Sequence, residues 1–363
     1  MIWIFAGILW AGILVMRVES RWALTGFETA LFTLAAVSIA RQRFALRVHP
    51  IGAVLAGVVA WGLIQEAAGI SVDAQRTLES CLHWAANCAA FSLGLWLARE
   101  RVVCQKFLTA ALIFALLVAI GAVIALFTIG SLGPFVYRNQ FAAFIEPALG
   151  LAIAAAMRDL RRPVLWVLIS AALFAAVVAA GSRTGSILCL TMLIALPVFA
   201  YFRGVISAGW LVRVALLGVV SALALVGVAG WETIWNRLQE PNPYSVRAEL
   251  NRSSFEMIRE RPLTGFGLGT WSSAYPKYAR FDNGTFVNQA HDDWAQWAVE
   301  GGLPLLIAML FVAARLAPAA IRSIWGMGLM AVLVHAAVDY PFEQRPALAA
   351  YLFALMGVLA AEG

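Results

Sequence analysis

The feature that most constrains this chain is a series of long apolar runs separated by short polar segments. A bilayer core of about 30 Å needs about 20 apolar residues in a helix, and twelve segments approach that length. These segments are 2–16, 22–40, 50–70, 81–98, 107–130, 140–157, 163–180, 185–202, 209–230, 293–314, 323–340 and 346–361. Only 13% of the 363 residues are charged, about half the share of a typical soluble domain. The sequence therefore predicts an all-α polytopic membrane protein with about twelve transmembrane helices in a lipid bilayer.

The basic residues indicate how these spans are oriented. Arg and Lys gather in one alternate set of the short loops, such as 41–47 and 158–162, and they are sparser in the opposite set. Since basic residues favour cytoplasmic loops, the Arg-rich set is expected in the cytoplasm together with both chain ends. The net charge of +6 is therefore attributed to membrane orientation, and no nucleic-acid partner is expected.

The spacing of the spans divides the chain into four regions. They are N-terminal transmembrane helices (1–130), central transmembrane helices (131–230), a long extracytoplasmic loop (231–292) and C-terminal transmembrane helices (293–363). A loop of this length in a compact protein is usually functional. Within it, the apolar spacing predicts a short helix over 246–260, which Pro262 ends.

The sequence contains no metal or nucleotide motif. Its four cysteines lie in or beside apolar runs, without the spacing of a metal site, so they are expected to be small buried residues. Gly265, Gly267 and Gly269 lack the preceding strand and the spacing of a dinucleotide fingerprint, and a close chain turn is expected there. We therefore expect no metal and no cofactor.

Two polar segments stand at the extracytoplasmic ends of predicted spans. Arg138 and Asn139 precede the span 140–157, where they either hydrogen-bond a ligand or anchor the helix at the headgroup layer. Arg183 lies in the turn 181–185 between two spans. An Arg near a helix end usually snorkels to the interface, but flanking glycines let a ligand approach closely. The residues alone leave both roles of Arg183 open.

A third polar segment lies where the long loop meets the next span, and it contains Asn288 and His291. A histidine can exchange a proton near neutral pH, although a lone His is more often a structural hydrogen-bonding residue. Asp292 or Asp293 could orient the ring of His291. The segment is therefore a candidate for acid–base chemistry.

Two arginines lie on the predicted loop helix, away from its apolar face. Arg247 and Arg252 could pair with Glu249 and Glu256, as on any solvated helix face. They could also bind an anion such as a diphosphate, because guanidinium groups make charge-assisted pairs of hydrogen bonds to phosphate. The residues alone leave both alternatives open.

Taken in chain order, five segments resemble the O-antigen ligase and O-antigen polymerase superfamily of bacterial envelope proteins. The segments are Phe135–Phe144 with its Arg-Asn pair, the Ser-Arg-Thr turn Gly181–Gly185, the Arg-Pro-Leu-x-Gly-x-Gly-x-Gly stretch Arg261–Gly269, the Ala-His and Glu-Gly-Gly segment Asn288–Pro304, and the His-x-x-x-Asp segment His335–Pro341. The resemblance covers roughly 131–361, and it implies a GT-C-like arrangement of spans with one long periplasmic loop.

The resemblance implies a reaction and roles for three residues. Such proteins transfer a glycan from undecaprenyl diphosphate to an acceptor hydroxyl at the periplasmic face of the bacterial inner membrane. Arg183 and Arg247 are then expected to hold the donor diphosphate, and His291 to act as base, without a metal. The residues expected to contact the substrates are Arg138, Asn139, Arg252, Asn288 and Asp292. The chain departs from the family pattern at Asp292, where Asn is usual.

The acceptor is not readable from these motifs. A ligase that uses lipid A-core as acceptor is favoured, because the segment around His291 resembles ligases. A polymerase that joins repeat units and a protein O-oligosaccharyltransferase are the alternatives. A transporter of lipid-linked glycan is less favoured, since transporters place charges near the bilayer midplane and often contain inverted repeats, whereas the unusual polar residues here gather at one face.

Overall fold

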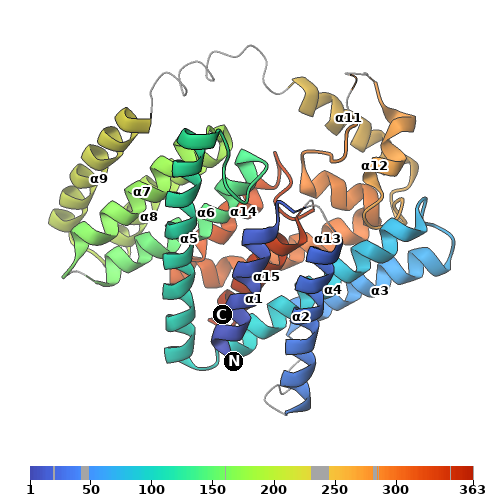
Figure 1. The fold of residues 1–363 in the computed structure, drawn as a ribbon, viewed down its shortest axis with the longest axis horizontal. Helices are drawn as coiled ribbons and strands as arrows, with labels where there is room; N and C mark the ends of the chain where they lie inside the picture. The colour runs from blue at the N-terminus through green and yellow to red at the C-terminus, as the bar shows by residue number, and fades with distance from the viewer. Residues whose placement is uncertain are drawn as a thin grey trace.

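The structure is a computed structural model that describes residues 1–18, 21–41, 49–159, 161–229, 245–280, 284, 286–343 and 345–362. Within these ranges the regular elements are helices, and the predicted all-α class is confirmed. In chain order they are α1 (Ile2–Val15), α2 (Arg21–Ala40), α3 (Pro50–Ala67), α4 (Ala74–Leu97), α5 (Arg101–Ile129), α6 (Arg138–Arg158), α7 (Pro163–Ala179), α8 (Arg183–Phe202), α9 (Ala208–Ala229), α11 (Ser245–Glu260), α12 (Trp271–Ala274), the 3-10 helix η1 (Tyr275–Tyr278), α13 (Asp293–Ser323), α14 (Met327–His335) and α15 (Pro346–Ala360). Figure 1 shows their arrangement.

A helix overlaps each of the twelve predicted apolar ranges. Six helices in the described part are long and apolar enough to cross a membrane, namely α2, α3, α5, α6, α8 and α13. The helices α1, α7 and α15 are apolar but shorter, and α14 has only 9 residues, so it fills part of the predicted span 323–340. The protein is therefore a helical membrane protein, while the number of about twelve spans stays a prediction.

The helix α15 forms the centre of the bundle. All of its residues from Ala347 to Leu359 are buried, as expected for a helix that is apolar on every side. It packs closely against α4 because each helix has a glycine at their contact. A Cβ on Gly94 would overlap the carbonyl of Ala354, and a Cβ on Gly357 would overlap the carbonyl of Phe91. Small residues let helix backbones approach in this way within membranes.

The glycine-rich stretch after α11 docks on the first part of α13. Its three glycines take positive φ angles, which confirms the close chain turn. The carboxylate of Glu300 accepts a hydrogen bond from the backbone N–H of Gly269 at 2.7 Å. Gly302 interrupts the helical geometry of α13 with a φ of 72°, and the N–H of Leu303 donates instead to Pro262 O at 2.7 Å. The long loop is thereby fixed to the C-terminal helices.

The helices α6, α8 and α14 bring together the chain around Asn139, Arg183 and Asp339. Figure 1 shows α14 beside α6, and glycines again allow the contact. A Cβ on Gly328 would lie 2.5 Å from the carbonyl oxygen of Glu146. A Cβ on Gly185 would overlap the side chain of Ala142. The N-terminal ends of α6 and α8 therefore lie close to each other and to the chain that follows α14.

Candidate active site

A cavity of about 640 Å³ lies among the N-terminal ends of α6 and α11, the segment before α13 and the segment after α14. We call it the Arg247 cavity. Its charged and amide lining residues are Arg17, Arg138, Asn139, Arg247, Asn288, His291 and Asp339. The structure thus gathers five of the residues predicted from sequence, drawn from three separate segments, around one space.

Asp339 holds the polar wall of this cavity together. The residue is 3% exposed, and its Oδ2 accepts hydrogen bonds from Asn139 Nδ2 and, at 3.0 Å, from Arg247 Nη2. Arg247 Nη1 also donates to Val338 O at 2.6 Å. A buried carboxylate requires such partners, because an unpaired buried charge is very costly. The guanidinium of Arg247 is therefore fixed at the edge of the cavity.

The start of α8 connects to the same network through Ser182. This residue caps the helix by accepting a hydrogen bond from Gly185 N at 3.2 Å, and its Oγ donates to Asn139 Oδ1 at 2.8 Å. A continuous chain of hydrogen bonds runs from Ser182 through Asn139 and Asp339 to Arg247. Arg183 is the next residue, half-buried at the first position of α8, so it lies beside the network but outside the residues that line the cavity.

His291 presents a neutral imidazole to the Arg247 cavity. Its ring lies edge-on to that of Tyr340, with 4.6 Å between the centroids and an interplanar angle of 77°. Burial lowers the pKa of His291 from 6.5 to about 4; the positive charge of Arg247 adds to this effect, and the Asp339 carboxylate opposes it. Among the described residues, its buried Nδ1 has no hydrogen-bond partner. At pH 7 the ring therefore has a lone pair with which it can accept a proton.

The backbone of His291 is also unusual. Its φ of 59° lies in the left-handed region, which residues other than glycine seldom adopt. Such a conformation costs on the order of 1–3 kcal/mol and tends to occur at functional sites. The next residue, Asp292, caps α13 by accepting a hydrogen bond from Ala295 N at 3.0 Å. The turn thus ends the long loop and aims the imidazole at the cavity.

Asp292 and Asp293, which the sequence suggested could orient the ring of His291, make their hydrogen bonds elsewhere in the described part of the chain. Asp292 acts as the helix cap, and burial raises its pKa. Asp293 accepts a hydrogen bond from Phe342 N at 3.0 Å. Arg252 lies outside the cavity, where its Nη1 pairs with Glu249 at 2.7 Å. The structure therefore places these three predicted residues in structural contacts.

Among the polar lining residues of the cavity, Asp339, Tyr340 and Arg17 were not assigned roles in catalysis or binding from the sequence. Asp339 appeared only within a segment that resembles the family, and Tyr340 and Arg17 were not singled out. Arg17 donates to Gly133 O at 3.2 Å and lies at the rim. The one sequence feature that could have revealed Asp339 is its acidic side chain at the end of an apolar segment, since a charge in that place needs a basic partner.

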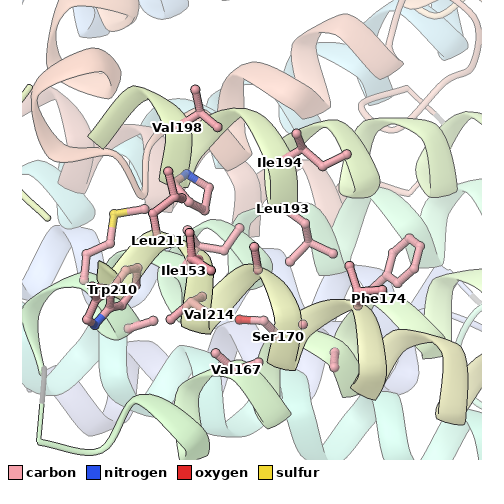
Figure 2. Close-up of a pocket in the computed structure, with 18 of the residues that line it drawn as sticks. Ile153, Val167, Ser170, Phe174, Leu193, Ile194, Val198, Trp210, Leu211 and Val214 are labelled. Carbon is pink, nitrogen blue, oxygen red and sulfur yellow. The ribbon is translucent and has the colours of Figure 1, made fainter. Parts of the chain in front are cut away.

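A second cavity, of about 390 Å³, lies between the later halves of α6 and α8, α7 and the start of α9. Figure 2 shows its lining, which is apolar apart from Ser170 and the indole N–H of Trp210. Ile153 lies fifteen residues beyond Arg138, which is roughly 22 Å along a helix. This cavity is therefore distant from the Arg247 cavity and lacks the groups needed for acid–base chemistry.

The comparison with known families agrees with the motifs. A family model described as O-antigen ligase matches residues 167–310, a range that contains Arg183, Arg247 and His291. A search of curated proteins finds no match. The matched range spans the start of α8, the long loop and most of α13, which together form much of the site described above. By this match, residues 167–310 are similar to the O-antigen ligase family.

Proposed function

We propose that the protein is a membrane glycosyltransferase that moves a glycan from undecaprenyl diphosphate to an acceptor hydroxyl, most simply on lipid A-core, as an O-antigen ligase does. We place the site at the periplasmic face of the bacterial inner membrane, where the arginine distribution orients the long loop. The observation that carries the proposal is the meeting of a fixed guanidinium, Arg247, and a neutral imidazole, His291, at one cavity.

The proposed step is a displacement at the anomeric carbon of the first sugar. The acceptor oxygen forms a bond to this carbon, while the bond from the carbon to the phosphate oxygen breaks and its electron pair leaves with the diphosphate. His291 takes the proton of the acceptor hydroxyl as the new bond forms. Arg247, together with Arg183 at the start of α8, stabilises the negative charge on the departing diphosphate. Arg suits this role because it stays protonated throughout.

The acceptor distinguishes this function from its alternatives. A polymerase and a protein O-oligosaccharyltransferase would use the same donor and the same base, with a second lipid-linked glycan or a protein hydroxyl as acceptor. The family match supports a reaction of this type. A gene deletion followed by gel analysis of surface glycans separates these functions. Loss of long chains on lipid A-core, with carrier-linked polymer accumulating, is expected for the ligase; single repeat units on lipid A-core would indicate a polymerase instead.

The role of His291 is tested with the variant His291→Asn. Asparagine tolerates the left-handed backbone better than most residues, so the turn is retained, but it cannot accept a proton. We expect transfer from the polyprenyl diphosphate donor to fall by roughly 10²–10⁴-fold, measured with purified protein in detergent.

The matched control is His49→Asn. His49 caps α3 by accepting a hydrogen bond from Ile51 N at 3.3 Å, and asparagine is a good capping residue, so transfer should be unchanged. If His291→Asn transfers glycan as fast as this control, His291 is not the base.

A further inference from the structure

A second polar cavity, of about 170 Å³, adjoins the proposed active site. We call it the α4 cavity. It lies between the first half of α4, the chain before α13 and the chain before α15. The polar side chains that the argument uses are Arg76, His83, Asn87, Asn288, Gln289 and Glu343. Together they offer both hydrogen-bond donors and hydrogen-bond acceptors.

The α4 cavity connects two other spaces. Asn288 lines both it and the Arg247 cavity. His83 and Glu343 line both the α4 cavity and another cavity, of about 330 Å³, between the end of α1 and the start of α2. The lining of that cavity is mixed: it includes the exposed apolar residues Val15 and Val18 and the basic residues Arg21 and Arg345. The α4 cavity therefore lies between the cavity near α1 and α2 and the Arg247 cavity, and it shares lining residues with each.

Two amide oxygens in the α4 cavity lack a partner among the described residues. Asn87 is 5% exposed, and its Oδ1 makes no hydrogen bond. Gln289 is partly buried, and its buried Oε1 also makes no hydrogen bond to any described residue. A buried polar atom without a hydrogen-bond partner is unfavourable, so it points to a hydrogen-bond donor that binds there. The cavity also admits groups larger than one water molecule.

The other polar groups of the cavity are held in place. His83 Nδ1 and Glu28 Oε1 are 2.6 Å apart, and Trp297 Nε1 donates to Glu343 Oε1 at 2.5 Å. Arg76 Nη1 donates to Ser272 Oγ at 2.8 Å. A wall of fixed polar side chains with two unused acceptors suits a ligand that has several hydroxyl groups, because each hydroxyl both donates and accepts.

We propose that the α4 cavity binds the glycan end of a lipid-anchored acceptor and leads its reactive hydroxyl past Asn288 to His291. This inference rests on the proposed function. The apolar part of the cavity between α1 and α2, which includes Val15 and Val18, would then hold the first part of the acceptor's lipid anchor. Donor and acceptor would thus approach the base from different sides. Asn87 and Gln289 accept hydrogen bonds from acceptor hydroxyls.

The test measures initial rates of transfer from undecaprenyl-diphosphate-linked glycan to lipid A-core. Each substrate is varied in turn, for the wild type, Asn87→Leu and Gln289→Ala. Each variant removes one unused acceptor, and Gln289 lies in a loop, where a failure to fold is less of a concern. We expect the KM for lipid A-core to rise roughly fivefold or more, while the KM for the donor stays the same. Ser92→Ala, farther along α4, is the control and should match the wild type.

A binding measurement makes the test independent of turnover. His291→Asn should still bind labelled lipid A-core, and adding Asn87→Leu or Gln289→Ala should weaken that binding by the same factor. An unchanged KM and unchanged binding for lipid A-core in both variants would overturn the acceptor site, and so would a rise in the donor KM alone. A wild-type protein that transfers no glycan from the donor would instead contradict the proposed function itself.

Discussion

The reactivity of His291 depends on three neighbours that face its ring. Tyr340 packs edge-on against it. Burial is the largest effect and lowers the pKa of His291; Asp339 raises this pKa, and Arg247 lowers it further. A base in this state is neutral at physiological pH, so it is ready to accept a proton. It is also a weak base, which suits a step in which the proton moves only as the acceptor oxygen attacks.

The lowered pKa of His291 predicts a loss of stability in acid. In the unfolded chain the ring titrates near 6.5, whereas in the folded protein it titrates near 4. Between these values the unfolded state binds a proton that the folded state does not, so stability falls as the pH falls. From pH 7 to pH 5 this contribution is about 2 kcal/mol.

The measurement is the melting temperature of purified wild-type protein and of His291→Asn at both pH values. The variant lacks the titrating ring and should lose less stability on acidification than the wild type does. Other titrating groups are common to the two proteins, so their effects cancel. Equal losses would show that the ring is not held in its neutral form.

At the scale of single elements, the contact between α6 and α8 sets the position of the site. Gly185→Ala would place a Cβ against Ala142, and 2.9 Å from Ser182 Oγ. Both helices must then separate, which is expected to cost about 1–3 kcal/mol and to weaken the hydrogen bond between Ser182 and Asn139. We expect a lower melting temperature and slower transfer.

The control for this change is Gly57→Ala. Gly57 lies within α3 and has open space where a Cβ would stand. Alanine is favoured over glycine in a helix, so this variant should be as stable as the wild type or slightly more so. A Gly185→Ala protein that behaves like Gly57→Ala would mean that α8 can move without affecting the network.

The helices could be predicted from the sequence more fully than their contacts. Long apolar runs gave a helix that overlaps each predicted range, because hydropathy is a local property. The kink of α13 at Gly302 was not predicted, since it depends on the backbone of Pro262 far away in the chain. The pairing of Arg247 with Asp339 was missed for the same reason. Residue types at a site can be read locally, but their partners require the fold.

At the scale of the whole molecule, the site is tied to the core through α14. The last residue of this helix, His335, is fully buried, and its Nδ1 lies 2.7 Å from Oε1 of the equally buried Glu146 on α6. Asp339 follows four residues later and carries the hydrogen bonds of the Arg247 cavity. The buried pair therefore fixes the end of the helix from which Asp339 is positioned.

This arrangement predicts a difference between breaking the buried pair and replacing it. Removing one partner leaves the other polar group unpaired in an apolar core, so Glu146→Leu or His335→Leu alone should destabilise the protein by about 3–5 kcal/mol. The double variant removes both groups, including Glu146 Oε2 and His335 Nε2, which have no partner among the described residues. It should therefore recover most of that loss. Thermal unfolding of the four proteins in one detergent gives the comparison. If the two single losses simply add in the double variant, the pair does not act as a unit, and another contact must hold Asp339 in place.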